Sequence, residues 1–365
     1  MARLGDYVKI RTGKLDANAS SLNGQYPFFT CSIEPLKIDT YSYDCECVLV
    51  AGNGDLNVKY YNGKFDAYQR TYIIESNDKT VLSVPYLYCF LDKYVETLRK
   101  QSIGGVIKYI KLGNLTEAQI PLCSMEKQLS IVKKLKKVNS IIDDRKLQLT
   151  KLDELVKSRF IEMFGTLESN EKECEIVTID DICSLIKDGT HQTPTYTENI
   201  ESGFKFLSSK DVMKQKIEWE DIKYIPKELH KKLYATLQPQ KNDILMSKNG
   251  VNYGVAAVND TDEVFDIYVS LALLRPSERI NPIYFRCVIN NPDTKHQFDS
   301  SIKGIGVPNL HLGEIRKTKI LLPPMNLQED FVSFVTQVDK SKLAIQQSLE
   351  KLETLKKALM QQYFG

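Results

Sequence analysis

The side chains best suited to recognition chemistry are hydrogen-bonding residues in the predicted loops of two separate segments. The first segment offers Asn53, Asn57, Lys59, Tyr61, Lys64, Tyr68, Gln69 and Arg70. The second offers Lys187, His191, Gln192, Thr193, Lys210, Lys248, Asn249 and Asn252. Asn, Gln and Arg can form paired hydrogen bonds with base edges, and Lys and Arg also bind phosphates. Together they predict a nucleic-acid surface, although each one alone can equally be a solvated loop residue.

Two positions in these segments carry a structural expectation as well. Tyr60 and Tyr61 alternate along a predicted hairpin, so one of the two rings is expected in the core. His191 lies three residues after Asp188, a spacing at which a turn-capping contact is the more ordinary role.

The sequence lacks the motifs that catalysis would need. The only Pro-Pro pair, Pro323-Pro324, is followed by Met325-Asn326 and not by the aromatic residue of an adenine methyltransferase pocket. There is no Gly-x4-Gly-Lys phosphate loop and no Glu-x-Lys triplet of a metal nuclease. The eight cysteines form no Cys-x-x-Cys pair, so reduced thiols are expected in place of a zinc site. We therefore expect a binding protein with no catalytic residue, metal or cofactor of its own.

The elements that position the first group of loops are short strands and one helix. Apolar runs at 28–31, 47–50 and 70–74 have strand length and strand composition. Turns are expected at 52–55 and at 61–64, where Asn62-Gly63 is a hairpin signal. Residues 86–100 have helical spacing, and 107–120 again resemble strands. The pattern predicts a mixed α+β domain.

Two long helices follow the two domains. Leu135, Ile142, Leu149, Val156 and Met163 recur every seven residues with no proline or glycine between them. Phe331, Val338, Ile345, Leu352 and Leu359 repeat the pattern in a helix that begins near residue 326. The apolar seams predict antiparallel pairing into a coiled-coil rod with a domain at each end.

The chain is a tandem repeat. Residues 102–165 align with 302–365 without a gap, so that 102–106 matches 302–306 and Phe164-Gly165 matches Phe364-Gly365. Residues 4–13 resemble 179–189 at an offset near 175, and 43–52 resemble 241–250. The second half therefore carries about 25 extra residues, which we expect within 191–245. Two pseudo-symmetric halves follow from this repeat.

Composition adds little about the partner. The 365 residues carry a net charge of +2, so overall charge does not indicate a nucleic-acid binder. Basic residues are unevenly placed, however, with ten Lys/Arg against six Asp/Glu in 125–165 and five against five in 325–365. No apolar run is long enough to cross a membrane, and the first residues lack a signal region, so a cytoplasmic protein is expected.

The repeat and several motifs resemble one known family, the specificity subunits of type I restriction–modification systems. The motifs are 187–196 (KDGTHQTPTY), 203–212 (GFKFLSSKDV), 306–310 (GVPNL) and 320–328 (ILLPPMNLQ), the last leading into the second long helix. The first half departs from the family pattern, because Ile120-Pro-Leu-Cys lacks the double proline and Lys108-Tyr109 replaces Pro308-Asn309.

The resemblance implies that residues 1–122 and 166–322 are target-recognition domains, each reading one half of a bipartite DNA site. It implies that the helices at 123–165 and 323–365 set the spacer between the half-sites. Two modification subunits that use adenosylmethionine to methylate adenine, and a restriction subunit that uses ATP and Mg²⁺, would be the partners in phage defence. The chain itself would be non-catalytic.

Two other interpretations stay open at the level of sequence. The chain can be the recognition module of a related restriction or phage-defence methyltransferase complex that shares these domains. It can also be a coiled-coil adaptor that binds only protein, although loops rich in Asn, Gln, Arg and Tyr speak against that class.

Overall fold

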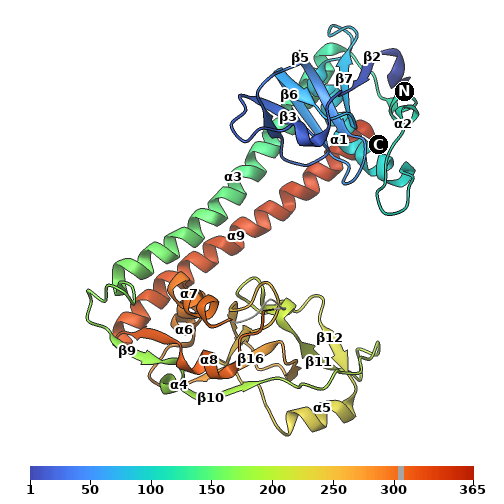
Figure 1. The fold of residues 1–365 in the computed structure, drawn as a ribbon. Helices are drawn as coiled ribbons and strands as arrows, with labels where there is room; N and C mark the ends of the chain where they lie inside the picture. Colours follow the sequence, from blue (N-terminus) through green and yellow to red (C-terminus); the bar gives the residue numbers. More distant parts are fainter. Residues whose placement is uncertain (303–307) are drawn as a thin grey trace. The chain divides into compact units, whose positions relative to one another are not determined.

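The computed structural model describes residues 1–302 and 308–365 (Figure 1). The chain divides into two compact units, one made of Met1–Gln148 with Ile345–Gly365 and the other of Leu149–Ala344. The predicted match of 102–106 with 302–306, and the start of the 306–310 motif, therefore fall largely outside the described residues. Within the described part, no helix is long and apolar enough to cross a membrane.

The first unit is built around a six-stranded sheet in the order β2-β7-β5-β6-β3-β4, in which only β3 and β6 run parallel. The strands of this unit are β1 (Ala2–Arg3), β2 (Val8–Thr12), β3 (Tyr26–Phe29), β4 (Leu36–Ile38), β5 (Tyr43–Ala51), β6 (Val58–Ala67), β7 (Thr71–Ser76) and β8 (Gln119–Ile120). Strands β1 and β8 pair with each other outside the six-stranded sheet. Its short helices are α1 (Val84–Gln101), α2 (Leu112–Thr116) and the 3-10 turns Leu4–Asp6 and Ala17–Ala19.

Helix α1 covers the sheet of the first unit. The Ser83 hydroxyl caps it by accepting a hydrogen bond from the Tyr86 N–H at 3.3 Å. Leu87, Phe90 and Leu91 recur at helical spacing and are buried against Val48 and Ile74 of the sheet. Burial of each such side chain contributes about 1.5–3 kcal/mol, so the apolar face fixes the helix on the sheet. The helix predicted at 86–100 is confirmed.

The second unit divides its strands among three sheets, β10-β16-β13-β14, β12-β11-β15 and β17-β9. The strands are β9 (Glu175–Thr178), β10 (Cys183–Asp188), β11 (Phe204–Leu207), β12 (Lys223–Ile225), β13 (Ile244–Ser247), β14 (Ala256–Val258), β15 (Phe265–Ile267), β16 (Leu271–Pro276) and β17 (Lys319–Leu322). The helices are α4 (Ile179–Ile182), α5 (Lys227–Tyr234), α6 (Pro282–Ile289), α7 (Pro292–Ser301), α8 (Leu312–Lys317) and the 3-10 turn Ser209–Val212.

Two long helices, α3 (Met125–Phe164) and α9 (Met325–Phe364), each contribute one part to each unit. At 40 residues each is about 60 Å long. They run antiparallel, since Lys146 lies 3.9 Å from Glu353 in the first unit and Lys342 lies 2.6 Å from Asp153 in the second. The predicted pair of long antiparallel helices is confirmed (Figure 1).

Each long helix begins and ends in the same way. The amide of Gln128 binds Ser83, Val81 and Cys123, and that of Gln328 binds Asn281, Arg279 and Pro323, all through backbone atoms. At the other end, Phe364 of α9 packs on Tyr86 in the first unit, and Phe164 of α3 packs on Tyr284 in the second. Both glutamines are fully buried, so the repeat extends to its polar core contacts.

Three local predictions from the sequence are wrong. Asn62-Gly63 is not a hairpin turn but lies inside β6, with Gly63 at φ +138°, and the turn between β5 and β6 lies at 52–57. Residues 112–116 form helix α2 and not a strand. Strand register pairs Ala51 with Thr71 and Ser247 with Leu271, so residue 250 corresponds to Gly54 and not to Gly52.

The extra residues of the second half lie mostly where they were predicted. The offset between equivalent residues is 176 at Gly13 and Gly189, 178 at Phe28 and Phe206, 196 at Ala51 and Ser247, and 200 at Asp66 and Asp266. The largest step falls between Leu207 and Ser247, a stretch that contains β12 and α5. The last step falls after residue 250 and thus beyond the predicted range.

Candidate nucleic-acid interface

The loop after β5 in the first unit and the loop after β13 in the second are held by the same three backbone hydrogen bonds. The N–H of Gly52 donates to Arg70 and that of Lys248 to Ser270, at 2.8 and 2.9 Å. The carbonyls of the same two residues accept from Ile110 and Leu310, at 2.9 and 2.8 Å. The N–H of Gly54 donates to Lys108 and that of Gly250 to Pro308, at 2.9 and 3.0 Å. We call these three bonds the loop clamp.

The loop clamp places Asn53 and Asn249 at equivalent positions. Asn53 forms an isolated bridge with Tyr109, and Asn249 forms one with Asn309. Gly54 and Gly250 follow with φ of +70° and +88°, a conformation that a residue with a Cβ rarely adopts. Backbone contacts therefore hold both asparagines in place, and the chain turns sharply at the glycine that follows each of them.

A second junction joins the end of β2 or β10 to the loop before β7 or β16. The N–H of Gly13 donates to Thr71 and that of Gly189 to Leu271, at 3.1 and 3.2 Å. A Cβ at either glycine would lie 2.1 Å from a carbonyl oxygen, that of Ala67 or of Ile267. Only glycine permits this close approach, so the loops at the ends of neighbouring strands meet at one place in each unit, which we call the loop edge of that unit.

In the first unit this edge gathers five of the predicted residues. Asn53, Asn57, Tyr68, Gln69 and Arg70 lie on the two loops that the Gly52–Arg70 hydrogen bond joins. The Asn57 amide donates to the Cys31 carbonyl at 2.8 Å and the Gln69 amide donates to Asp16 at 2.7 Å. Among the described residues, none accepts a hydrogen bond from the exposed Arg70 guanidinium. Arg70 is therefore the side chain of this edge with the most freedom to reach a ligand.

Three other residues named in the first unit are engaged within the fold. The Lys59 ammonium donates to the Asn57 side chain, and burial lowers the pKa of Lys59. The Tyr61 ring packs at 5.0 Å from Phe29, so Tyr61 and not the exposed Tyr60 is the partly buried member of that pair. Lys64 lies opposite Asp44, at the other end of β5 from the clamped loop, with its ammonium 4.6 Å from the Tyr41 ring.

In the second unit the corresponding edge carries His191, Gln192, Thr193, Lys248, Asn249 and Asn252. Of these, His191, Gln192, Thr193 and Asn252 are exposed. Lys187 and Lys210 lie nearby, but the Lys187 ammonium donates to the Thr236 carbonyl at 2.8 Å and Lys210 pairs with Asp211 at 2.8 Å. Gln192, Thr193 and Asn252 are therefore the exposed side chains with no hydrogen bond or ion pair to another described residue.

Lys248 is buried beneath its loop. Its side chain is 5% exposed, and its ammonium lies 2.9 Å from a carboxylate oxygen of Asp188. His191 approaches the same oxygen at 3.2 Å. Burial alone would raise the pKa of Asp188, but the hydrogen bond and charge of Lys248, with His191 beyond it, lower the pKa below its usual value. Lys248 thus supports the loop from inside, and a direct contact with DNA is not expected of it.

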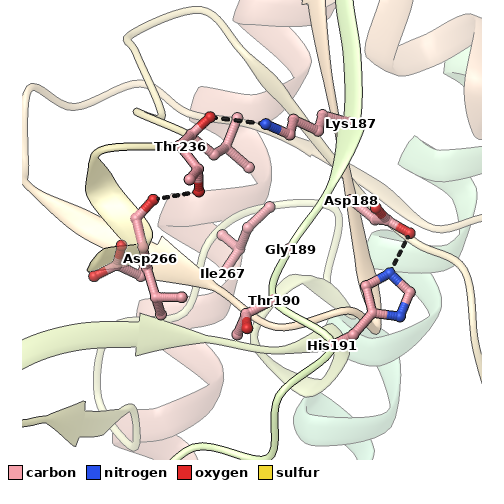
Figure 2. Close-up of a pocket in the computed structure, with 10 residues that line it drawn as sticks. Lys187, Asp188, Gly189, Thr190, His191, Thr236, Asp266 and Ile267 are labelled. Atoms are coloured by element: carbon pink, nitrogen blue, oxygen red, sulfur yellow. Dashed lines mark hydrogen bonds and ion pairs between the residues drawn. The ribbon is translucent and has the colours of Figure 1, made fainter. Parts of the chain in front are cut away.

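A cavity of about 200 Å³ adjoins this cluster (Figure 2). Its walls include residues 187–191, Thr236 and Asp266. Figure 2 shows Lys187 reaching Thr236 and His191 turned toward Asp188. Asp266 is 2% exposed and pairs with His230 at 2.7 Å, and burial raises the pKa of Asp266 against the opposing effect of that contact. No group of three or more metal-binding side chains occurs among the residues described.

The sequence did not identify two features of these edges. One is the Asp188–Lys248 pair, because 60 residues separate its members and nothing local marks Lys248 as buried. The other is the loop 103–109, which is closed by two hydrogen bonds between Ile103 and Tyr109 and exposes Val106 fully. The Lys108 carbonyl of this loop accepts the hydrogen bond from Gly54 that belongs to the loop clamp. The position of the loop within the ungapped repeat was the one feature of the sequence that could have pointed to it.

Comparison with known proteins identifies the family. A family model described as the type I restriction modification DNA specificity domain matches residues 1–152 and 171–356. The EcoDI type I restriction enzyme specificity subunit of Escherichia coli is 37% identical over 167 residues, a match that spans 46% of this chain and 37% of that relative. The MjaVIII specificity subunit of Methanocaldococcus jannaschii is 23% identical to this chain, in an alignment that covers 99% of this chain and 90% of the length of that subunit.

Solved structures show the same fold. The type I restriction–modification S subunit from M. genitalium aligns over 100% of this chain and 95% of its own, with a TM-score of 0.60 at 15% identity. A chain from a structural study of complex assembly in the type I R-M system aligns over 100% of this chain and 96% of its own length, with a TM-score of 0.57.

Proposed function

Because this chain belongs to the type I restriction-modification DNA specificity family, we propose that each of its two units reads one half of a bipartite DNA target. The chain is the sequence-reading subunit of a larger complex and catalyses nothing itself. Of the sixteen residues named from the sequence, those on the clamped loops and on the loops beside them would contact the bases, whereas Lys64 lies away from these loops and Lys248 supports one of them from inside.

The observation that carries the proposal is the pair of loop clamps. The same backbone bonds hold Gly52-Asn53-Gly54 in one unit and Lys248-Asn249-Gly250 in the other. The flanking side chains differ, since Arg70 in the first unit corresponds to Ser270 in the second. A shared backbone with different side chains is what two readers of unlike half-sites require, because base edges are distinguished by side-chain donors and acceptors.

The partners follow from the same proposal. Two modification subunits would bind adenosylmethionine and methylate adenine in each half-site, and a restriction subunit would use ATP and Mg²⁺ to translocate and cut unmethylated DNA. Helices α3 and α9 are the only described elements shared by both units, so they are the proposed determinant of spacer length.

A domain exchange tests the reading assignment. Residues 166–324 of a relative would replace those of this chain, so that β9 and β17, which pair with each other, move together. Methylome sequencing of cells that express the hybrid with its modification subunit should show one half-site changed and the other retained. The reciprocal exchange of residues 1–124 is the control and should change the opposite half-site. Alteration of both half-sites by either hybrid would contradict independent readers.

An insertion tests the spacer assignment. Four residues would be added after Leu147 and four after Leu349, positions that the Lys146–Glu353 contact places nearly opposite each other. The pair of helices lengthens by about 6 Å, so the methylated motif should gain spacer bases and keep both half-site sequences. A changed half-site sequence would refute the spacer role.

A further inference from the structure

Four lysines form an exposed basic surface on the first half of α3. Lys133, Lys134, Lys136 and Lys137 are all exposed, whereas Ile131 and Val132 before them and Leu135 between them are buried in the core of the first unit. At 100° per residue, Lys133 and Lys137 lie opposite the buried face, and Lys134 and Lys136 flank them. We call these four residues the α3 basic surface.

The α3 basic surface is not neutralised within the fold. None of its four lysines has a hydrogen bond or ion pair with another described residue. Lys136 is close enough to interact electrostatically with the Glu46 carboxylate. That carboxylate, however, already binds Lys79 at 2.7 Å and Tyr60 at 2.8 Å. Four like charges within about 6 Å of helix axis repel one another, which favours binding of an anionic partner.

The repeat does not duplicate this surface. The equivalent positions of α9 are Ser333, Phe334, Thr336 and Gln337, at the offset of 200. Over residues 125–148 there are seven Lys/Arg and three Asp/Glu, against two and three over 325–348. The shared apolar seams and the buried Gln128 and Gln328 are kept in both helices, so the lysines are a feature of the first half alone.

We propose that the α3 basic surface binds the phosphate backbone of DNA without regard to sequence. The inference rests on the proposed function and adds a second kind of DNA contact to it. Two copies of one modification subunit would use surfaces present on both helices, and this surface is present on one. Double-stranded DNA carries one charge per about 1.7 Å of axis, so two to four phosphates can face four ammonium groups this closely spaced.

The test measures binding of the full-length chain to a 40-base-pair duplex of mixed sequence by fluorescence anisotropy, from about 50 to 200 mM KCl. The variant replaces all four residues (Lys133→Gln, Lys134→Gln, Lys136→Gln, Lys137→Gln). Each lost phosphate contact reduces the slope of log K against log salt by about 0.9, so the slope should become shallower by about 2–4. Affinity near 0.1 M KCl should fall by about tenfold or more.

Two further variants act as controls. Arginine at the same four positions should retain the affinity and the slope, since phosphate binds either cation. Glutamine at Lys151, Lys157, Lys340 and Lys357, exposed lysines spread over the same two helices, should change the slope by less than about 1. Circular dichroism checks that helix content is unchanged in each variant.

Several results would overturn the proposal. An unchanged slope in the glutamine variant, an equal loss in the scattered-lysine control, or no salt-dependent binding by the unaltered chain would each do so. Retained DNA binding with lost co-purification of the modification subunit would assign the surface to a protein partner instead. The duplex is chosen to lack the motif that methylome sequencing identifies, so failure of this test leaves the half-site test of the proposed function unaffected.

Discussion

Removing the carboxylate of Asp188 should destabilise the second unit more than removing the whole Asp188–Lys248 pair. In Asp188→Ala the ammonium of Lys248, whose side chain is 5% exposed in the unaltered chain, loses the partner that lies 2.9 Å away. An uncompensated buried charge costs about 3–5 kcal/mol, and because Asp188 is itself 19% exposed we expect the lower end, about 3 kcal/mol. In Asp188→Ala with Lys248→Met no buried charge remains, so stability should return to within about 1 kcal/mol of the unaltered chain.

The repeat supports this reasoning. The first unit has Thr12 and Gly52 at the positions equivalent to Asp188 and Lys248, and it forms the same loop clamp. The clamp therefore does not require an ion pair. The ion pair matters for another reason, because loss of Asp188 leaves the Lys248 charge on a side chain that is only 5% exposed.

The assay uses the only tryptophan of the sequence, Trp219, which lies in the second unit against Phe265. Urea unfolding followed by Trp219 fluorescence reports that unit by itself. A loss of about 3 kcal/mol also corresponds to a melting shift of about 6–12 °C for a unit of this size. The exposed pair Lys205–Glu263 is the matched control, because Glu263→Ala should cost no more than about 1 kcal/mol.

The pH dependence gives a second readout of the same pair. The pKa of Asp188 is lowered in the folded chain, so its contribution to stability is present above its unfolded pKa of about 3.9. That contribution is lost as the pH falls through the folded pKa. The stability difference between the unaltered chain and Asp188→Ala should therefore be constant from pH 7 to 5 and shrink below about pH 4. Equal stability of the single and double variants at pH 7 would refute the account of a stranded charge.

Three other outcomes are expected. Gly13→Ala and Gly189→Ala should each cost about 1–3 kcal/mol in urea unfolding, because the new Cβ would meet a backbone oxygen at 2.1 Å, whereas Gly113→Ala, with nothing within 4 Å, should be close to neutral. Phe364→Ala should cost the first unit about 3–5 kcal/mol by circular dichroism and leave the Trp219 transition in place, since Phe364 packs on Tyr86 and Phe90. Arg70→Ala should weaken binding by about 1–3 kcal/mol through the first half-site only, as measured by competition with duplexes altered in one half-site at a time; equal weakening with either duplex would count against its placement.

Sequence reasoning recovered the parts of the fold that local periodicity determines. The seven-residue spacing through Leu135 and Ile142 marks residues that are in fact buried, and the ungapped offset of 200 holds from Asp66 and Asp266 to the final phenylalanines. Long helices are predictable because each turn repeats the same local constraint.

Strand pairing depends on distant residues and was less accessible. Asn62-Gly63 is a strong local hairpin signal, yet the eight-residue register between β5 and β6 keeps it within a strand. The energy of that ladder outweighs the preference of two residues. Burial is likewise invisible in a loop sequence, which is why Lys248 looks like a solvated cation although only 4% of its surface is exposed.

The loop clamps suggest why one backbone can serve two different half-sites. Every bond of the clamp joins backbone atoms, so the side chains at Asn53, Arg70 and Asn249 are not needed to form it. Exchange of those side chains therefore carries little penalty in folding stability, and they are free to vary with the bases they meet. The glycines are different, because Gly54, Gly250, Gly13 and Gly189 provide conformations or close approaches that other residues cannot. Stability thus resides in the backbone and glycines of each edge, which leaves specificity to the side chains around them.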